Sequence, residues 1–556
     1  MFDYLGDVQT MPQRAGLRSL GLFAEDLEKP FVGIVVSGSG MTRGAEHLKA
    51  LAEYAAEGVR SAGGVCRTFF VSAPDNLISQ GHHGANFGLP SRETVCDQLE
   101  ALIAAYRFNG LVFVPDGVNA AAGMMMAACR TNLPCAVIPG GPKRARSVKG
   151  ARTGIGDIAL RAAGIRAGKT ALADLEAAED ALCAVGCGDA LCTEETFFAV
   201  LEALGFSLPD ACCMPAEEAG RLEMARNTGR ALMKAAAEGR TPKTLVNKLS
   251  FKNALAALLA LGFNFNTLLH LRAMAAELDL NVPKELGNDV IHAAAEKIPL
   301  LVSFAPYGQT YWEDFWAAGG LRQVFKNLEA DQLLSFDSQD LCGDTLTQRL
   351  SGFEAESGEH IRDRENAYLA RAGVAALHGN VCEEGALIDF RLTPPEQYQR
   401  SGYAKVYDSE EEAAQGIMSG TVRPGMFVFI RGEGPAGGPG MREMIAPSQA
   451  LISMKLEDSV TLVTDGRISA LIPGGVVCFC APEAVNGGFV GGVKDGDTVE
   501  LDILKRRLNA KVSSREIAGR MRKLKVTQKD NTGLLKRYAD LVTDVSVGCV
   551  LAEERD

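Results

Sequence analysis

Short apolar runs alternate with helix-patterned stretches through the first 140 residues of the chain. Four runs are bounded by glycine, proline or polar residues and read as buried strands: Phe31–Val36, Arg67–Val71, Gly110–Val114 and Pro134–Ile138. Between the first two, apolar residues recur at helical spacing from Leu48 to Ala62. Strand–helix–strand units of this length predict an α/β fold with a helix-covered, mostly parallel sheet and right-handed crossovers.

The loops that follow the first three of these strands are the expected place for a ligand. They comprise Ser37–Gly44, Asp75–Pro90 and Pro115–Ala122. In open parallel sheets the binding crevice lies beyond the carboxyl ends of the strands, so the three loops should meet there. We also predict that Ser91 caps the helix that follows the second loop.

The pattern changes twice more along the chain. Residues from about 171 to 334 are predominantly helical, whereas short strands separated by Gly, Pro and Asp turns predominate in the last third. The clearest of these strands are Met426–Ile430, Val460–Val463, Val476–Phe479 and Thr498–Leu501. Because 556 residues are too many for one compact core, we expect an N-terminal α/β domain over 1–370 and a β-rich domain over 371–556.

Charge and composition exclude several classes of protein. The chain has 57 basic and 69 acidic residues, a net charge of −12, and no long basic run, which argues against nucleic-acid and membrane partners. No apolar stretch is long enough to span a membrane, and the N-terminus lacks the apolar core of a signal peptide. The 14 cysteines are scattered and do not form a disulfide spacing pattern. We therefore expect a cytoplasmic protein.

Several motifs carry a resemblance to a known family. Arg431–Met441 reads RGEGPAGGPGM, Thr464–Ser469 reads TDGRIS, Gly81–Gly84 reads GHHG and Leu89–Glu93 reads LPSRE. In this order they resemble the IlvD/Edd family of dihydroxy-acid and sugar-acid dehydratases, which remove water with an iron–sulfur cluster beside a magnesium ion. The resemblance implies an α/β N-terminal domain, a β-barrel-like C-terminal domain, and a homodimer or dimer of dimers with the active site between the domains.

The resemblance also implies roles for individual residues. Asp75 and Glu433 match carboxylates that bind magnesium in the family, and Ser469 matches the serine taken to remove the Cα proton. Candidate substrate-binding residues in the matching segments are Ser37, Asn119, Gly438 and Arg467. Mg²⁺ often uses only one or two protein carboxylates, so Asp75 and Glu433 are sufficient for it or a similar divalent ion. The alternative is that both form ordinary loop-capping hydrogen bonds.

Other positions depart from the family. Its Cys-Asp-Lys triplet, which supplies a cluster ligand, a magnesium carboxylate and a carbamylated lysine, falls on residues 117–119, which read Gly-Val-Asn. Two further cluster cysteines fall on Gly44 and Gly188, and the neighbouring Cys187 is interpreted as a packing residue. An iron–sulfur cluster needs several thiolates in a fixed geometry. We therefore predict that the chain has no cluster.

Three functions remain open for the sequence. The first is a dehydratase-like lyase acting on a small hydroxy-carboxylate or sugar acid, with His82, His83 or Asp116 as the general acid for the leaving hydroxyl. The second is an epimerase, isomerase or carbon–carbon lyase that uses proton abstraction alone. The third is a catalytically silent relative that binds a small acid or acts as a scaffold.

Overall fold

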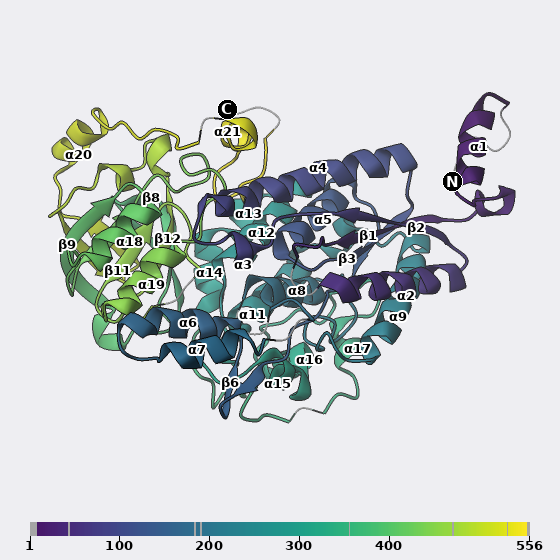
Figure 1. The fold of residues 1–556 in the computed structure, drawn as a ribbon, viewed down its shortest axis with the longest axis horizontal. Helices are drawn as coiled ribbons and strands as arrows, with labels where there is room; N and C mark the ends of the chain where they lie inside the picture. Colours follow the sequence, from purple (N-terminus) through teal and green to yellow (C-terminus); the bar gives the residue numbers. More distant parts are fainter. Residues whose placement is uncertain are drawn as a thin grey trace.

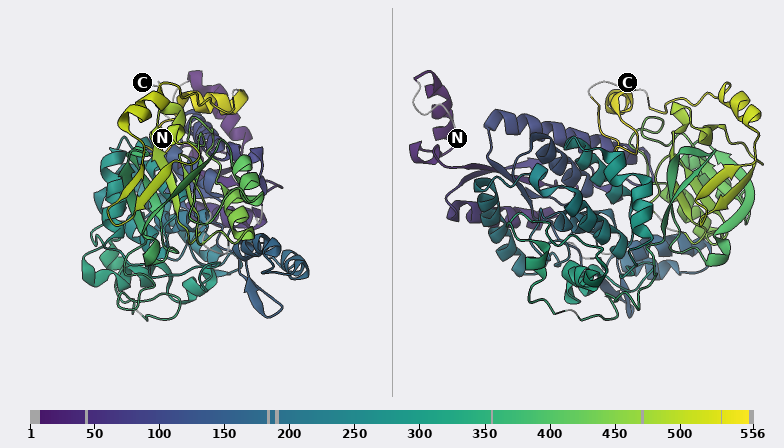
Figure 2. Two further views of the ribbon diagram at one scale, coloured as in Figure 1. Left: turned by 90° about the vertical axis from the view of Figure 1, so that its left-hand side faces the viewer. Right: turned by 180° about the vertical axis from the view of Figure 1, so that it is seen from behind.

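The computed structural model describes residues 8–42, 45–182, 185–188, 192–354, 356–469, 472–530 and 532–552. The molecule is elongated, with a sheet-and-helix part at one end and a barrel at the other (Figure 1). The helix α1 (Met11–Ser19) projects from the end that is remote from the barrel, as the right-hand view in Figure 2 shows. Among the described residues, no helix combines the length and the apolar character needed to cross a bilayer.

A four-stranded parallel sheet forms the centre of the N-terminal part, as the sequence pattern predicts. Its strand β1 (Phe31–Ser37) lies between β2 (Val65–Val71) and β3 (Gly110–Val114), and β4 (Cys135–Val137) pairs with β3. Every residue of β1 and β3 is buried. These strands are apolar throughout because both faces of a helix-covered parallel sheet are packed against other side chains.

Helices cover the sheet on both sides. In Figure 1, α4 (Gly88–Tyr106) and α5 (Val118–Thr131) lie above it, and α2 (Leu48–Ser61) and α9 (Gly220–Ala237) lie below it. The α2–α9 pair is close because a glycine lies at the contact: a Cβ on Gly58 would overlap a backbone oxygen of α9. The close approach of the two helices therefore requires that Gly58 has no side chain.

The helix α4 begins earlier than predicted. Ser91 is not its N-cap, because the helix starts at Gly88 and the Ser91 hydroxyl donates to the Gly88 carbonyl at 2.7 Å within the first turn. Pro90 is tolerated there, since the first N–H groups of a helix have no intrahelical acceptor to lose. The expected long loop before it contains α3 (Asn76–Ser79) and the 3₁₀ helix η4 (His83–Phe87).

The middle of the chain is built from buried helices that connect the sheet to the barrel. Among them are α8 (Thr193–Ala203), α11 (Lys248–Leu261), α12 (Phe265–Glu277), α14 (Asn288–Ala295) and α16 (Gly320–Asn327). Both α11 and α12 pack on α8, and almost all of their apolar side chains are buried. A helix that is apolar around its whole circumference belongs to the interior of a large protein.

Eight strands close into a barrel in the C-terminal part. Their order around the barrel is β10-β11-β12-β8-β7-β14-β13-β9. Their bounds are β7 (Val374–Gly379), β8 (Cys382–Asp389), β9 (Gln399–Tyr407), β10 (Phe427–Ile430), β11 (Thr461–Thr464), β12 (Val476–Ala481), β13 (Thr498–Asp502) and β14 (Arg507–Ala510). Side chains of β10 alternate between two cores: Phe427 and Phe429 pack in one, and Val428 and Ile430 pack in the core shared with the helices.

The last described segment returns from the barrel to the N-terminal part. The helix α21 (Gly533–Leu541) packs on α4, and the carbonyls of Gly548 and Cys549 accept hydrogen bonds from the buried Arg92 of α4 at 3.1 and 2.7 Å. The C-terminal segment is therefore joined to α4 of the N-terminal part.

Candidate functional site

A narrow crevice lies at the carboxyl ends of β1, β2 and β3, where the parallel sheet predicts one. We call it the sheet crevice. Its lining includes the predicted residues Ser37, Asp75 and Asn119, together with Asp116 and Cys187. Its volume is about 20 Å³, enough for one water molecule. Three loops that are distant in the sequence thus contribute predicted residues to one place.

Hydrogen bonds fix the polar lining of the sheet crevice. Asn119 Nδ2 donates to Asn76 Oδ1 at 2.6 Å, and Ser37 Oγ accepts from the backbone N–H of Asp116 at 2.7 Å. The Asp75 carboxylate caps α3 by accepting from two of its backbone N–H groups at 2.9 and 3.2 Å. The capping alternative for Asp75 is therefore present in this structure, and its use as a metal ligand stays a prediction.

Cys187 lines the sheet crevice. It precedes Gly188, the position at which the family has a cluster cysteine. Its thiol donates to the Asp116 carboxylate at 3.0 Å, and burial raises the pKa of this thiol well above its usual value. Cysteine ligates metals as the thiolate, and iron–sulfur clusters use several of them. The described lining contains one cysteine and so does not supply such a ligand set. Gly44, Cys183 and the segment 189–191 lie outside the described residues.

Ser469 follows β11, and its hydroxyl donates to the carboxylate of Glu443. Asn266 Nδ2 donates to Ser469 Oγ at 3.2 Å, while its Oδ1 accepts from Arg467 at 2.8 Å. The Arg467 guanidinium is 4% exposed and lies 3.6 Å from the Glu443 carboxylate. We call these four residues the Ser469 group. A buried carboxylate, compensated by an arginine, is thus placed to accept the serine proton.

The sequence analysis did not identify Glu443 or its role. The available signal was its place two residues after Met441, directly beyond the glycine-rich motif. That signal does not show which hydroxyl the carboxylate contacts, because 26 residues separate Glu443 from Ser469.

Asn266 connects the Ser469 group to the sheet crevice. Its Nδ2 also lies 3.2 Å from the hydroxyl oxygen of Thr193, and the next residue, Glu194, lines the crevice. Thr193 and Asn266 lie at the starts of α8 and α12, respectively. The Ser469 group and the sheet crevice are therefore linked through the first residues of two buried helices.

The glycine-rich loop, residues 432–440, is held by two buried carboxylates. Asp465 accepts from two N–H groups at its start, both at 3.0 Å, and Glu483 accepts from two in its middle at 3.0–3.2 Å. Burial, with the nearby charge of Asp465, raises the pKa of Glu483 to about 8. The N–H of Gly438, a predicted substrate contact, donates within the loop to the Gly434 carbonyl at 2.9 Å.

Glu433, the second predicted metal ligand, contacts a cation of the chain itself. Its carboxylate is 2.6 Å from the ammonium of Lys529 and also accepts from the backbone N–H of Glu410 at 3.2 Å. Glu433 is 2% exposed, and this burial raises its pKa to about 7, although Lys529 opposes the shift. Lys529 is a second residue that the sequence did not reveal, because nothing in its local pattern marks it.

The two histidines of the predicted active-site loop are exposed. Nδ1 of His82 accepts from the backbone N–H of Gly84 at 3.0 Å, and the His83 ring lies 3.9 Å from Asp530 and edge-on to Phe87. Neither is among the described residues that line the sheet crevice. Their role as proton donors stays a prediction, and Asp116 is the general-acid candidate that the crevice contains.

Two groups of side chains that could hold a metal ion also occur in the described part of the chain. Cys192, Glu194 and Glu195 form one such group, and Asp340, Cys342 and Asp344 form another. Neither group contains Asp75 or Glu433. The first adjoins the sheet crevice through Glu194.

Comparisons with known proteins cover nearly the whole chain. Residues 29–349 match the family model described as dihydroxy-acid/6-phosphogluconate dehydratase N-terminal, and residues 359–549 match the corresponding C-terminal model. Similar relatives named dihydroxy-acid dehydratase come from Caldanaerobacter subterraneus subsp. tengcongensis, Pyrococcus abyssi and Aquifex aeolicus. They are 35%, 36% and 35% identical over 549 residues, which cover 98% of each chain.

Proposed function

Because the chain belongs to the dihydroxy-acid/6-phosphogluconate dehydratase family, we propose that it is a lyase that acts on a small hydroxy-carboxylate or sugar acid. We propose further that it removes the Cα proton without an iron–sulfur cluster. The observation that carries the proposed proton abstraction is the hydrogen bond from the Ser469 hydroxyl to the Glu443 carboxylate.

The Ser469–Glu443 contact supports proton abstraction. A free serine hydroxyl is too weakly acidic to be ionised near neutral pH, so it needs an acceptor for its own proton. In the proposed step the Cα–H bond breaks, the proton moves to Ser469 Oγ, and the serine proton moves to Glu443. The electron pair of the C–H bond passes into an enolate-like state of the substrate carboxylate, and Arg467 adds positive charge nearby.

The leaving group needs a proton. For dehydration, the β-carbon–oxygen bond breaks and the hydroxyl leaves as water when a general acid protonates it. Asp116 is the candidate within the sheet crevice, and His82 and His83 are the candidates on the adjoining exposed loop. The single thiol among the described lining residues favours such a proton donor over cluster iron.

We also propose that the chain binds a divalent ion such as Mg²⁺. Asp75 and Glu433 offer the carboxylate oxygens that Mg²⁺ prefers, and Glu443 is a further carboxylate beside Ser469. When bound, the ion would supply positive charge next to the enolate-like state. Metal analysis of the wild type, Asp75→Asn and Glu433→Gln after equilibration with Mg²⁺ tests the assignment. Equal metal content in all three would contradict it.

Hydrogen–deuterium exchange distinguishes the candidate functions. The protein is incubated in D₂O with candidate 2,3-dihydroxy acids and sugar acids, and the Cα proton and any keto-acid product are followed by NMR. Exchange with product, abolished by Ser469→Ala and retained in the turn-serine control Ser459→Ala, supports the lyase. Exchange without product indicates an epimerase or isomerase, and no exchange with any candidate indicates a silent relative.

The cluster and the assembly need separate measurements. Anaerobically purified protein with visible cluster absorbance and stoichiometric iron and sulfide would overturn the cluster-free part of the proposal. Light scattering in solution measures whether the chain forms the homodimer or dimer of dimers that we propose from its family.

A further inference from the structure

A larger cleft lies on the barrel, at the opposite end of the molecule from α1 (Figure 1). We call it the basic cleft. It has a volume of about 1140 Å³ and lies between α20 (Ser514–Met521), the 3₁₀ helix η8 (Phe489–Gly492) and the residues after each. A cleft of this volume is large enough to hold a small-molecule ligand.

Positive charge predominates in the lining of the basic cleft. The cations are Arg431, Lys494, Arg520, Arg522, Lys523 and Lys525, against two acidic residues, Asp495 and Glu516. Both acidic residues already have cationic partners, because Asp495 pairs with Lys405 and Glu516 pairs with Arg520 at 2.6 Å. The cleft is therefore electropositive in a chain whose net charge is −12.

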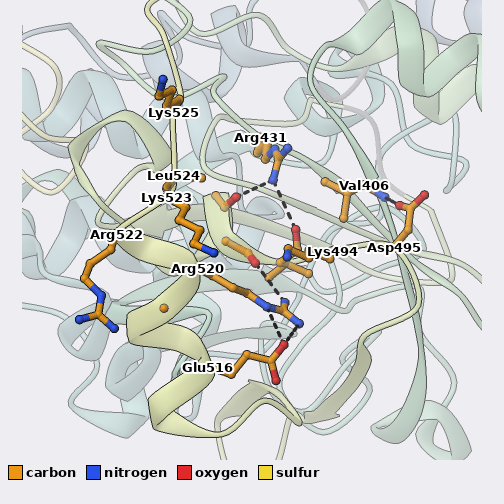
Figure 3. Close-up of a pocket in the computed structure, with 14 residues that line it drawn as sticks. Val406, Arg431, Lys494, Asp495, Glu516, Arg520, Arg522, Lys523, Leu524 and Lys525 are labelled. Atoms are coloured by element: carbon orange, nitrogen blue, oxygen red, sulfur yellow. Dashed lines mark hydrogen bonds and ion pairs between the residues drawn. The ribbon is translucent and has the colours of Figure 1, made fainter.

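Two arginines form a rigid floor for the basic cleft. Arg431 donates to backbone carbonyls of Gly491 and Val493 and pairs with Asp408 at 2.6 Å. Arg520 pairs with Asp497 and donates to the Gly492 carbonyl at 3.1 Å. It also pairs with Glu516, as Figure 3 shows. Side chains held in this way lose little further freedom when a ligand binds.

Four cations remain for a ligand, and one of them, Lys494, interacts electrostatically with Asp497. Arg522, Lys523 and Lys525 are exposed, and their side chains make no hydrogen bond or ion pair within the described part of the chain. In Figure 3, Lys523 extends from the end of α20 toward Arg520 and Lys494. Like charges gathered without acidic partners repel one another, and an anion relieves that repulsion.

We infer that the basic cleft binds a small molecule that carries several negative charges, such as one with two or more phosphate groups. Arginine and lysine together suit phosphate oxygens, since arginine supplies a planar fork and lysine a compact charge. A nucleic acid fits less well, because the chain as a whole is acidic, with a net charge of −12. The site is distinct from the Ser469 group and does not depend on the proposed reaction.

Calorimetric titration with inorganic tripolyphosphate, in low salt and without divalent ions, tests the inference on the full chain. We expect saturable binding that weakens as NaCl is raised, since exposed charges are screened. Lys523→Glu should weaken it about tenfold, which corresponds to about 1.4 kcal/mol. Lys248→Glu, an equal change of charge on an exposed residue that does not line the cleft, should leave binding unchanged.

Several results would overturn the inference. They are the absence of binding at millimolar tripolyphosphate, equal affinity in the wild type and a folded Lys523→Glu variant, or equal losses in Lys523→Glu and Lys248→Glu. Stronger binding of a 20-nucleotide single strand than of tripolyphosphate would instead indicate a nucleic-acid surface. Melting curves confirm that each variant is folded, and no turnover assay is involved, so the outcome is independent of the proposed function.

Discussion

At the scale of single residues, the Ser469 hydroxyl is defined by its neighbours. Asn266 donates to its oxygen, Glu443 accepts its proton, and Arg467 places a positive charge beside that carboxylate. Each neighbour controls one property of the hydroxyl: its orientation, its proton and the local charge. The Ser469 group can therefore be tested by changing a single atom of Glu443.

Glu443→Gln removes the proton acceptor while keeping the side-chain volume. We expect the rate of Cα proton exchange to fall by about 10²–10⁴-fold, the usual contribution of a positioned base, with little change in binding of the acid. NMR exchange rates in D₂O check this expectation. Glu500→Gln, which changes an exposed carboxylate of β13, serves as the control. An unchanged rate in Glu443→Gln would rule out the relay.

Burial also controls the charge of residues away from the site, and Glu202 is a clear case. It is 3% exposed and accepts from the backbone N–H groups of Asp210 and Cys212, both at 3.0 Å. Burial, with the charge of Asp210 second, raises its pKa from the usual 4.5 to about 7. Its ionisation in the folded state is therefore costly near neutral pH.

The folded-state pKa of Glu202 lies above the unfolded value, which sets the sign of its pH dependence. Its stabilising contribution is complete below about pH 4.5 and is lost as the pH rises through about 7. Relative to Glu202→Gln, which cannot ionise, the wild type should lose on the order of 3 kcal/mol between pH 4 and pH 8. Unfolding measured at intervals across this range checks the trend, and a constant difference would contradict it.

At the scale of elements, the glycine-rich loop docks on the 3₁₀ helix η4. Asn86 of η4 donates from Nδ2 to the Pro439 carbonyl at 2.8 Å, and a Cβ on Gly440 would overlap the Asn86 backbone oxygen. Gly440 also has a φ of +90°, in the left-handed region. The contact between the N-terminal part and the C-terminal part is close because this residue has no side chain.

Gly440→Ala should therefore be more harmful than strain alone predicts. Gly425 is a matched control, since its φ is +83° but no atom lies within 4 Å of its hypothetical Cβ. We expect Gly425→Ala to cost about 1–2 kcal/mol and Gly440→Ala to cost at least about 1–3 kcal/mol more. Denaturant unfolding of both variants measures the difference. Equal losses would show that the loop and η4 separate without cost.

At the scale of the whole molecule, the C-terminal segment is tied to the first part through the buried Arg92. Its guanidinium pairs with Glu93 at 2.6 Å and donates to the carbonyls of Gly548 and Cys549. Both members of the pair are nearly inaccessible to solvent. A buried charge that loses its partner is strongly destabilising, whereas removal of both charges is far less so.

Arg92→Met should lower the free energy of unfolding by about 3–5 kcal/mol, because it leaves Glu93 buried and unpaired and frees two carbonyls. The double variant Arg92→Met/Glu93→Met should recover part of that loss, since the isolated charge is gone. Denaturant midpoints of the two variants and the wild type test this order of stability. A double variant less stable than Arg92→Met would contradict it.

The amino-acid sequence was sufficient to predict the parallel sheet, its main strands and the edge of the sheet at which the crevice lies. Local patterns were sufficient for two reasons. A continuous apolar run such as Phe31–Ser37 indicates a strand that is buried on both faces. The carboxyl ends of parallel strands lie at a common edge of the sheet. Ser37, Asp75 and Asn119 were predicted as site residues on that basis and on family motifs, and the crevice contains them. The predicted start of α4 was wrong, because a serine next to a proline is an ambiguous signal for a helix N-cap.

The partners and the protonation of the predicted groups depend on the packing of the folded chain. Glu443 and Asn266 reach Ser469 across 26 and 203 residues, and Lys529 reaches Glu433 across 96. Such partners leave no periodic signal, because side-chain contacts between loops depend on how the sheet, helices and barrel pack and not on local spacing. Burial sets proton affinity for the same reason: it is a property of the packed molecule, whereas the sequence fixes only which groups can titrate.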